Sequence, residues 1–234
     1  MASAATGIEN TASEKSRHDW SEHWSEGKQK SLSQKFFSFY RQAVFARSVA
    51  YFVDRYFSEC GVFVEAGCGT AETSMRINKR RGQRKLVAVD IVQPILKDCH
   101  PVMDERVCSN IFHLPFADDS VDGIWNVGVM EHFTQSEIDL ILNEFHRVLK
   151  PGERLILLIP GADSPPQKIL RVFEFFINLR RPEKDFRFHP PEISQVKSKR
   201  QGMEMLRRNN FQTVRYESGW RSLFAFKTLV AVKR

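Results

Sequence analysis

The chain has 234 residues and a mass of 27.2 kDa, which predicts one globular domain with room for a small cap. Hydrophobic residues make up 42% of it and charged residues 27%, so a sizeable core is possible and global disorder is excluded. No run approaches 18 consecutive apolar residues, and the sequence therefore predicts no transmembrane helix. The net charge of +7 is uneven, because residues 165–234 carry 16 Lys and Arg against 6 Asp and Glu. This basic third could face nucleic acid, an anionic membrane or an acidic substrate, or it could be solvated surface.

The N-terminal part of the sequence lacks the signals of export, and the cysteines lack those of metal binding. Residues 1–18 are rich in Ala, Ser and Thr and predict a disordered leader without the apolar central region of a secretory signal. The cysteines form no Cys-x-x-Cys pair and have no histidine at zinc spacing, so we expect free thiols and no metal site. They are Cys60, Cys68, Cys99 and Cys108. Free thiols and the missing signal favour a cytoplasmic location.

A helical segment is predicted over residues 19–60, ahead of the first strand. Trp20 and Trp24 stand one helical turn apart. Over residues 33–58, aromatic residues and valines recur at steps of three and four, which predicts a long helix that ends at Gly61. This segment could be a lid whose aromatic faces exclude water from a site, or its apolar stripe could pack on the rest of the domain.

From there on, short apolar runs alternate with helical patterns. Strands buried on both faces are predicted at 62–64, 86–89, 123–127 and 155–159. Helices are predicted at 70–79, 94–99 and 136–149. This alternation indicates right-handed crossovers and a mainly parallel sheet. In the tail, the expected elements are a helix near 202–208 and two closely joined, hence antiparallel, strands at 211–217 and 223–232.

The most informative segment runs from Val62 to Glu72, where a buried strand leads through Gly67 and Gly69 into a helical pattern. Two glycines at this spacing let the backbone turn sharply and approach a ligand at the carboxyl end of a strand. A dinucleotide-binding loop would need a third glycine in place of Glu72, whose carboxylate would repel a pyrophosphate, and no Gly-Lys-Ser/Thr of a phosphate loop follows. Asp90 ends the next strand, 21 residues after Gly69, and can accept hydrogen bonds from both hydroxyls of a ribose. The loop therefore predicts a nucleoside ligand without its phosphates.

Four motifs, in this order, resemble those of the class I S-adenosylmethionine-dependent methyltransferases, in particular the domain of small-molecule and quinone methyltransferases. They are Glu65-Ala66-Gly67-Cys68-Gly69-Thr70, Val87-Ala88-Val89-Asp90, the run 110–122, and the run 129–133 together with 144–153. The resemblance covers about residues 61–159. It implies an α/β fold with a Rossmann-like seven-stranded sheet, mainly parallel with an antiparallel final strand. The domain would cover residues 61–234, with an N-terminal helical lid and an insertion at about 161–200.

The same resemblance implies S-adenosyl-L-methionine as the cofactor and assigns it a set of binding residues. They are Glu65, Gly67, Cys68, Gly69, Thr70, Asp90, Ile91, Asn110, Ile111 and Asn126. Glu65 would order the glycine loop and act on the ammonium group of the methionine part, directly or through water. Asp90 would bind the ribose hydroxyls, and Ile91 would lie against the adenine. Asn110 replaces the aspartate usual in the family and would still accept from the adenine amino group through its carbonyl, and Asn126 would offer that group its backbone carbonyl.

His132 is the candidate catalytic residue. It follows the fourth predicted strand, beside the point where the resemblance places methyl transfer. A neutral imidazole there could take a proton from an acceptor hydroxyl or amine. The alternative is that His132 shapes the wall of the acceptor site without taking part in the chemistry.

The predicted protein is a transferase that methylates a small, hydrophobic or aromatic acceptor. The insertion carries a broad apolar face over 169–179, which could roof the acceptor site, touch a bilayer edge or pack against the core. Two other readings stay open: an RNA or protein methyltransferase that uses the basic C-terminal third, and a catalytically silent cofactor-binding partner protein. The sequence Asn126-Val127-Gly128-Val129 lacks the Asn/Asp-Pro-Pro-Tyr/Phe tetrad that amino-group nucleic-acid methyltransferases often carry, which disfavours nucleic acid.

Overall fold

A computed structural model describes residues 45–161, 171–172, 174–176, 178–179, 193–194, 196–219, 221 and 224–234. The predicted leader over 1–18, Trp20, Trp24 and the first part of the predicted long helix lie outside these residues. Among the described residues, no helix combines the length and apolarity needed to cross a membrane.

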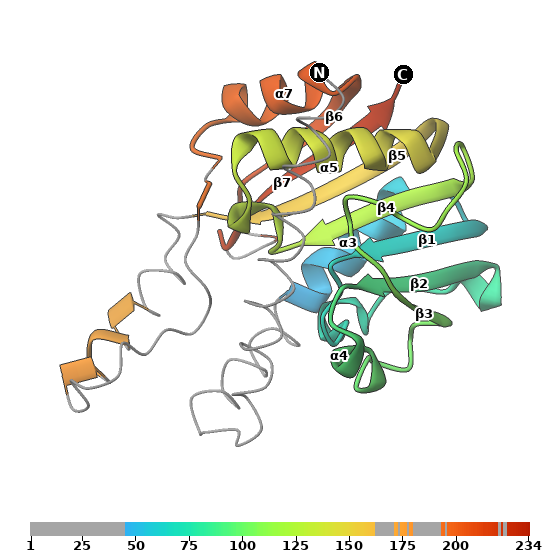
Figure 1. Ribbon diagram of the computed structural model, residues 1–234, viewed down its shortest axis with the longest axis horizontal. Helices are drawn as coiled ribbons and strands as arrows, with labels where there is room; N and C mark the ends of the chain where they lie inside the picture. The colour runs from blue at the N-terminus through green and yellow to red at the C-terminus, as the bar shows by residue number, and fades with distance from the viewer. Residues whose placement is uncertain are drawn as a thin grey trace.

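The centre of the molecule is a seven-stranded sheet in the order β3-β2-β1-β4-β5-β7-β6 (Figure 1). The strands are β1 (Gly61–Ala66), β2 (Arg84–Asp90), β3 (Glu105–Cys108), β4 (Val121–Val127), β5 (Leu149–Pro160), β6 (Phe211–Glu217) and β7 (Phe226–Lys233). The first five pair in parallel, and β7 pairs antiparallel with both β5 and β6. The prediction of a mainly parallel seven-stranded sheet with an antiparallel final strand is confirmed.

The chain changes direction within the sheet between β1 and β4. From β1 it runs outward through β2 to β3, and it then returns to the other side of β1 to form β4 and β5. Open α/β sheets bind their ligands at such a switch point, outside the carboxyl ends of the strands. In Figure 1 the arrowheads of β1, β2 and β4 point to the same side, and this common side is called the carboxyl edge below.

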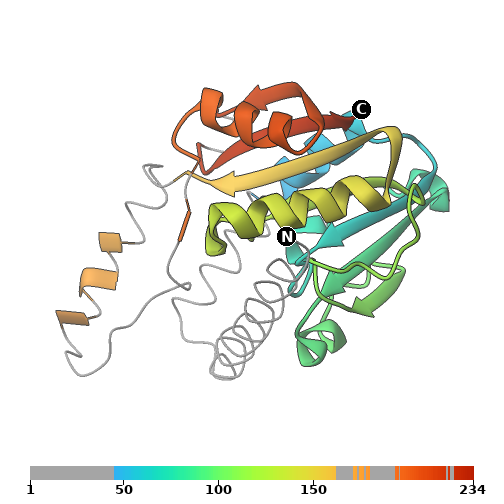
Figure 2. The same ribbon diagram turned by 45° about the horizontal axis from the view of Figure 1, so that its top comes forward.

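Helices cover both faces of the sheet. One face packs against α3 (Ala46–Tyr56) and α4 (Gln93–Lys97), and the other packs against α5 (Gln135–Val148) and α7 (Lys199–Arg208). Figure 2 shows α5 and α7 on the same side of the sheet. The described part of the predicted lid, α3, is therefore a packing helix, and Phe52 within it is buried against the sheet.

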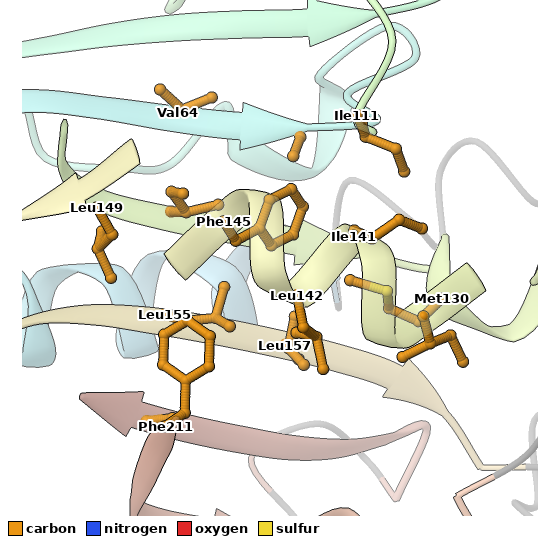
Figure 3. Close-up of a cluster of buried hydrophobic side chains, with 14 of the residues drawn as sticks. Val64, Ile111, Met130, Ile141, Leu142, Phe145, Leu149, Leu155, Leu157 and Phe211 are labelled. Atoms are coloured by element: carbon orange, nitrogen blue, oxygen red, sulfur yellow. The ribbon is translucent and has the colours of Figure 1, made fainter. Parts of the chain in front are cut away.

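Successive side chains of each strand point to opposite faces of the sheet, so the core consists of two clusters, one on each face. In β1, Val64 faces the α5 side and Phe63 faces the α3 side. Helix α5 begins with a capping box in which Thr134 and Glu137 satisfy each other's backbone amides. Its buried residues, which form one stripe, are Ile138, Ile141, Leu142, Phe145 and Val148. Figure 3 shows three of them, Ile141, Leu142 and Phe145, against the strands.

Two sequence predictions near β1 are wrong. The helix expected over 70–79 is absent; a short 3₁₀ turn, η3 (Glu72–Ser74), lies there, and a second, η4 (Arg80–Gly82), follows it. Ala71 has a φ of 52°, and the amide of Ser74 donates to the carbonyl of Ala71, three residues back, as in a 3₁₀ turn. Gly61 does not end the preceding helix, which stops at Tyr56, but begins β1.

Candidate functional site

The predicted site residues follow neighbouring strands at the carboxyl edge. Glu65 and the glycine loop end β1, Asp90 ends β2, and Asn126 lies near the end of β4. Asn110 follows β3, the neighbour of β2, and His132 lies in η5 (Met130–His132), directly after β4. The site residues therefore come from four separate parts of the sequence, and two of them, Asp90 and Asn126, contact the glycine loop or the residue just before it.

Hydrogen bonds to the end of β2 fix the backbone of the glycine loop. Gly67 and Gly69 have φ values of 74° and 51°, in the left-handed region that favours glycine. The amides of Gly67 and Cys68 both donate to the carbonyl of Val89, at 2.9 and 3.0 Å. A Cβ atom on Gly67 would lie 2.7 Å from a methyl group of Val129, so only glycine fits between this loop and the segment that follows β4.

Asp90 joins the glycine loop to the end of β2. Its Oδ2 accepts from the amide of Gly69 at 2.8 Å, and its Oδ1 accepts from the amide of Val92 at 2.9 Å. The residue is 9% exposed; burial raises the pKa of its carboxyl group, and the two amides oppose that rise. Since a carboxylate oxygen can accept more than one hydrogen bond, these contacts leave acceptor capacity for a ligand. Contact with a ribose stays a prediction.

Glu65 is a fully buried carboxyl group beneath the loop. It accepts hydrogen bonds from the hydroxyls of Thr73 at 3.2 Å and Ser74 at 2.8 Å. The indole of Trp125 donates to the same Ser74 hydroxyl at 3.1 Å. Burial raises the pKa of Glu65 to about 8, although the hydrogen bond from Ser74 lowers it. Glu65 thus orders the turn that follows the glycine loop, and its action on an ammonium group stays a prediction.

Two asparagines shape the edge on either side of β1 and β2. The Asn126 amide group donates to the carbonyl of Ala66 at 2.6 Å, which ties β4 to the start of the glycine loop. The Asn126 side-chain oxygen is buried and has no hydrogen-bond partner among the described residues. The side-chain oxygen of Asn110 accepts from the amide of Phe112 at 3.1 Å and so closes the turn after β3. Ile111 is only 7% exposed and belongs to the core beneath α5, whereas Ile91 is partly buried.

His132 lies beside a second buried acid, Glu131. Its Nε2 is 3.7 Å from Oε1 of Glu131, and the two side chains are 9% and 5% exposed. The end of the insertion packs on the same turn: the amides of Ile193 and Ser194 donate to the carbonyl of Glu131 at 2.7 and 3.0 Å. No sequence pattern predicts this contact, because it joins residues more than 60 positions apart.

Arg147 of α5 fixes the loop that runs from β3 to β4. Its guanidinium donates to the carbonyls of Leu114 and Phe116 at 3.2 and 3.0 Å and pairs with Asp118 at 2.6 Å. Glu144, also bound to Arg147, accepts from the amide of Leu114 at 2.6 Å. These contacts hold the segment that carries Asn110 against the core.

The residues present fit a nucleoside cofactor. The loop has two glycines at positive φ, Asp90 offers carboxylate acceptors, and Asn126 offers a buried acceptor that lacks a described partner. Within the described ranges, no three His, Cys, Asp or Glu side chains are grouped as metal ligands would be. The sheet order and the glycine loop at its switch point define the fold of the class I S-adenosylmethionine-dependent methyltransferases.

Comparison with known proteins agrees with this class. The profile of the methyltransferase domain family matches residues 64–157. A malonyl-[acyl-carrier protein] O-methyltransferase of Methylovorus sp. is 30% identical over 112 residues, which cover 43% of this chain and 37% of that protein. The matched part thus spans well under half of this relative's length. Residues 64–157 thus match the methyltransferase domain family, and the chain is similar to class I S-adenosylmethionine-dependent methyltransferases.

Solved structures share the fold at low sequence identity. Magnesium protoporphyrin IX methyltransferase from Synechocystis, crystallised with S-adenosylhomocysteine, is 16% identical with a TM-score of 0.61, over 91% of this chain and 94% of that one. A Haloferax volcanii methyltransferase in complex with the Trm112 activator is 14% identical with a TM-score of 0.61, over 83% and 92% of the two chains.

Proposed function

We propose that the protein transfers the methyl group of S-adenosylmethionine to a small, hydrophobic or aromatic acceptor. The observation that carries this proposal is the hydrogen bond from the amide of Gly69 to Asp90, which joins a carboxylate to the glycine loop beside the switch point. Gly67, Cys68, Gly69 and Thr70 would hold the methionine part, with Glu65 beneath them. Asp90, Ile91, Asn110, Ile111 and Asn126 would hold the nucleoside.

The bound cofactor supplies an electrophilic methyl group on a sulfonium. The contribution of this chain is to hold the acceptor in line with that methyl group at near contact distance. His132 would take the acceptor's proton at a ring nitrogen, and Glu131, 3.7 Å away, would stabilise the imidazolium that results. If the acceptor is already nucleophilic, His132 would only position it.

A hydrophobic acceptor is favoured over nucleic acid by the way the basic residues are paired. Of the described basic residues of α7 and β6, Arg207 pairs with Glu204, Arg208 with Asp139 and Arg215 with Glu217. These acids reduce the positive field that phosphate binding requires. The Synechocystis relative, in addition, is named for magnesium protoporphyrin IX, a large aromatic ring system.

Calorimetry on the purified protein tests the cofactor assignment. S-adenosylhomocysteine should bind and NAD should not. Asp90→Ala should weaken that binding by about 1–3 kcal/mol, the range for polar groups left unpaired. Asp98→Ala, which removes an exposed carboxylate just after α4, is the matched control and should bind normally. Tight binding of NAD, with no binding of S-adenosylhomocysteine or S-adenosylmethionine, would overturn the proposal.

A further inference from the structure

The insertion after β5 presents a row of exposed apolar side chains. The described residues within 171–179 are helical, and four apolar positions follow the spacing i, i+3, i+4, i+7, which places them along one side of a helix. These residues, called the apolar stripe below, are Val172, Phe175, Phe176 and Leu179, and they are 54%, 64%, 55% and 67% exposed. The alternative that the predicted apolar face packs against the core is wrong for Val172, Phe176 and Leu179.

The burial in this helical segment is the reverse of that in the rest of the molecule. Glu174 and Asn178 are half-buried, whereas the apolar stripe faces outward. In α5 the apolar side chains are buried beneath the helix, as is usual. The rings of Phe175 and Phe176 contact each other edge to face, with centroids 5.7 Å apart, so they form one continuous apolar patch. Exposed patches of this kind mark sites of contact with a partner or a membrane.

The place of the stripe ties it to the candidate site. The insertion leaves the sheet at Pro160, the carboxyl end of β5, and its returning end binds the turn that holds Glu131 and His132 through Ser194. In Figures 1 and 2 the helical pieces of the insertion, drawn in orange, project beyond the carboxyl edge. A surface bound to the stripe would therefore lie on the side of the molecule where the acceptor enters.

Charge identifies the kind of surface that fits. Residues 165–191 carry six Lys and Arg against three Asp and Glu. The six basic residues are Lys168, Arg171, Arg180, Arg181, Lys184 and Arg187. A second copy of the chain would bring the same excess of positive charge against this segment, and the two would repel. An anionic lipid surface is complementary both to the charge and to phenylalanine side chains at the depth of the headgroups.

We propose that the apolar stripe docks the protein on an anionic membrane surface, so that the carboxyl edge faces a lipid-dissolved acceptor. The docking rests on the exposed stripe and its charge alone, whereas the lipid-dissolved acceptor rests on the proposed function. The side chains of the stripe enter the interface between headgroups and acyl chains, and the net positive charge of residues 165–191 attracts the anionic headgroups.

Vesicle co-sedimentation of the full chain tests the docking. The vesicles contain phosphatidylcholine alone or with about 30% phosphatidylserine, which supplies the anionic surface. The double variant Phe175→Ser/Phe176→Ser removes the centre of the stripe. The double variant Met203→Ser/Val214→Ser is the matched control, because it removes two exposed apolar side chains, 39% and 50% exposed, from α7 and β6. Calorimetry with S-adenosylhomocysteine is run on all three proteins.

The wild type and the control should bind the phosphatidylserine vesicles, and Phe175→Ser/Phe176→Ser should bind about tenfold more weakly or worse. Equal binding by all three proteins would show that charge alone holds the protein and would overturn the proposal. A stripe-dependent dimer in light scattering, without vesicle binding, would also overturn it. The two proposals can fail separately. A protein that binds the cofactor but not the vesicles would overturn the docking alone. A protein that binds the vesicles but not the cofactor would overturn the methyltransferase proposal alone.

Discussion

Replacing Glu65 by glutamine is the sharpest test of how the buried carboxyl group beneath the glycine loop behaves. Its pKa is raised from 4.5 to about 8 because burial removes water from the charged form. Between these pH values the folded protein holds a proton that the unfolded chain has released. The free energy of unfolding must therefore fall as the pH rises through this window, since the folded state binds more protons.

The size of the effect follows from the shift. A change of 3.5 units, from 4.5 to 8, corresponds to roughly 5 kcal/mol at 1.36 kcal/mol per unit. The free energy of unfolding should show none of this decrease below pH 4.5 and the whole of it above pH 8. Glutamine keeps the shape of the side chain and its contacts with Thr73 and Ser74 but has no proton to release. Glu65→Gln should therefore lack this part of the pH dependence and gain stability relative to the wild type as the pH rises.

Urea unfolding between pH 5 and pH 9 measures the difference. Circular dichroism follows the loss of the whole fold. Glu105→Gln, an exposed glutamate of β3, is the control and should track the wild type at every pH. If the free-energy difference between wild type and Glu65→Gln stayed constant from pH 5 to pH 9, the argument from burial would be refuted.

Three further substitutions test other parts of the site. His132→Ala should leave cofactor affinity almost intact and lower the methyl-transfer rate by about 10²–10⁴-fold, and an acid limb that persists in the variant's pH–rate profile would exclude the role of base. Gly67→Ala should lower the free energy of unfolding by about 1–2 kcal/mol, since a residue with left-handed backbone would then carry a Cβ atom, and it should weaken cofactor binding in calorimetry. Gly82→Ala is the control: Gly82 also has a positive φ but open space around it, so this variant shows backbone strain without a contact like that with Val129. Arg147→Met should lower the unfolding free energy by about 2–3 kcal/mol in urea, because two backbone carbonyls and Glu144 lose their partner; a change under 0.5 kcal/mol would contradict this.

The sequence predicts most of the strands because their burial is continuous. Val64, Val87 and Leu155 belong to apolar runs, which are typical of strands covered on both faces. The strand β3 has no such run: Glu105, Arg106 and Cys108 are exposed, and the strand lies at the edge of the sheet. A strand held mainly by backbone hydrogen bonds leaves no hydrophobic pattern, and β3 was therefore not predicted.

The local geometry around the glycine loop could be predicted only in part. The paired glycines and Asp90 indicate a ligand loop, and both glycines do adopt left-handed φ values. The failed helix over 70–79 has a tertiary cause that no periodicity contains: the hydroxyls of Thr73 and Ser74 bind the carboxyl group of Glu65, on a different element. Polar contacts with a neighbouring element override local helical preference here.

The position of β7 inside the sheet has a consequence for how the chain is made. Its residues, Phe226–Lys233, come last in chain order, yet the strand lies between β5 and β6. While a ribosome is still synthesising this stretch, the earlier strand β6 has no neighbour to join, and β5 carries an open edge of unpaired backbone groups. Such an edge can pair with another nascent chain. Completion of the fold therefore waits for the final strand, and a chain that stops short of Phe226 should aggregate rather than accumulate as a trimmed domain.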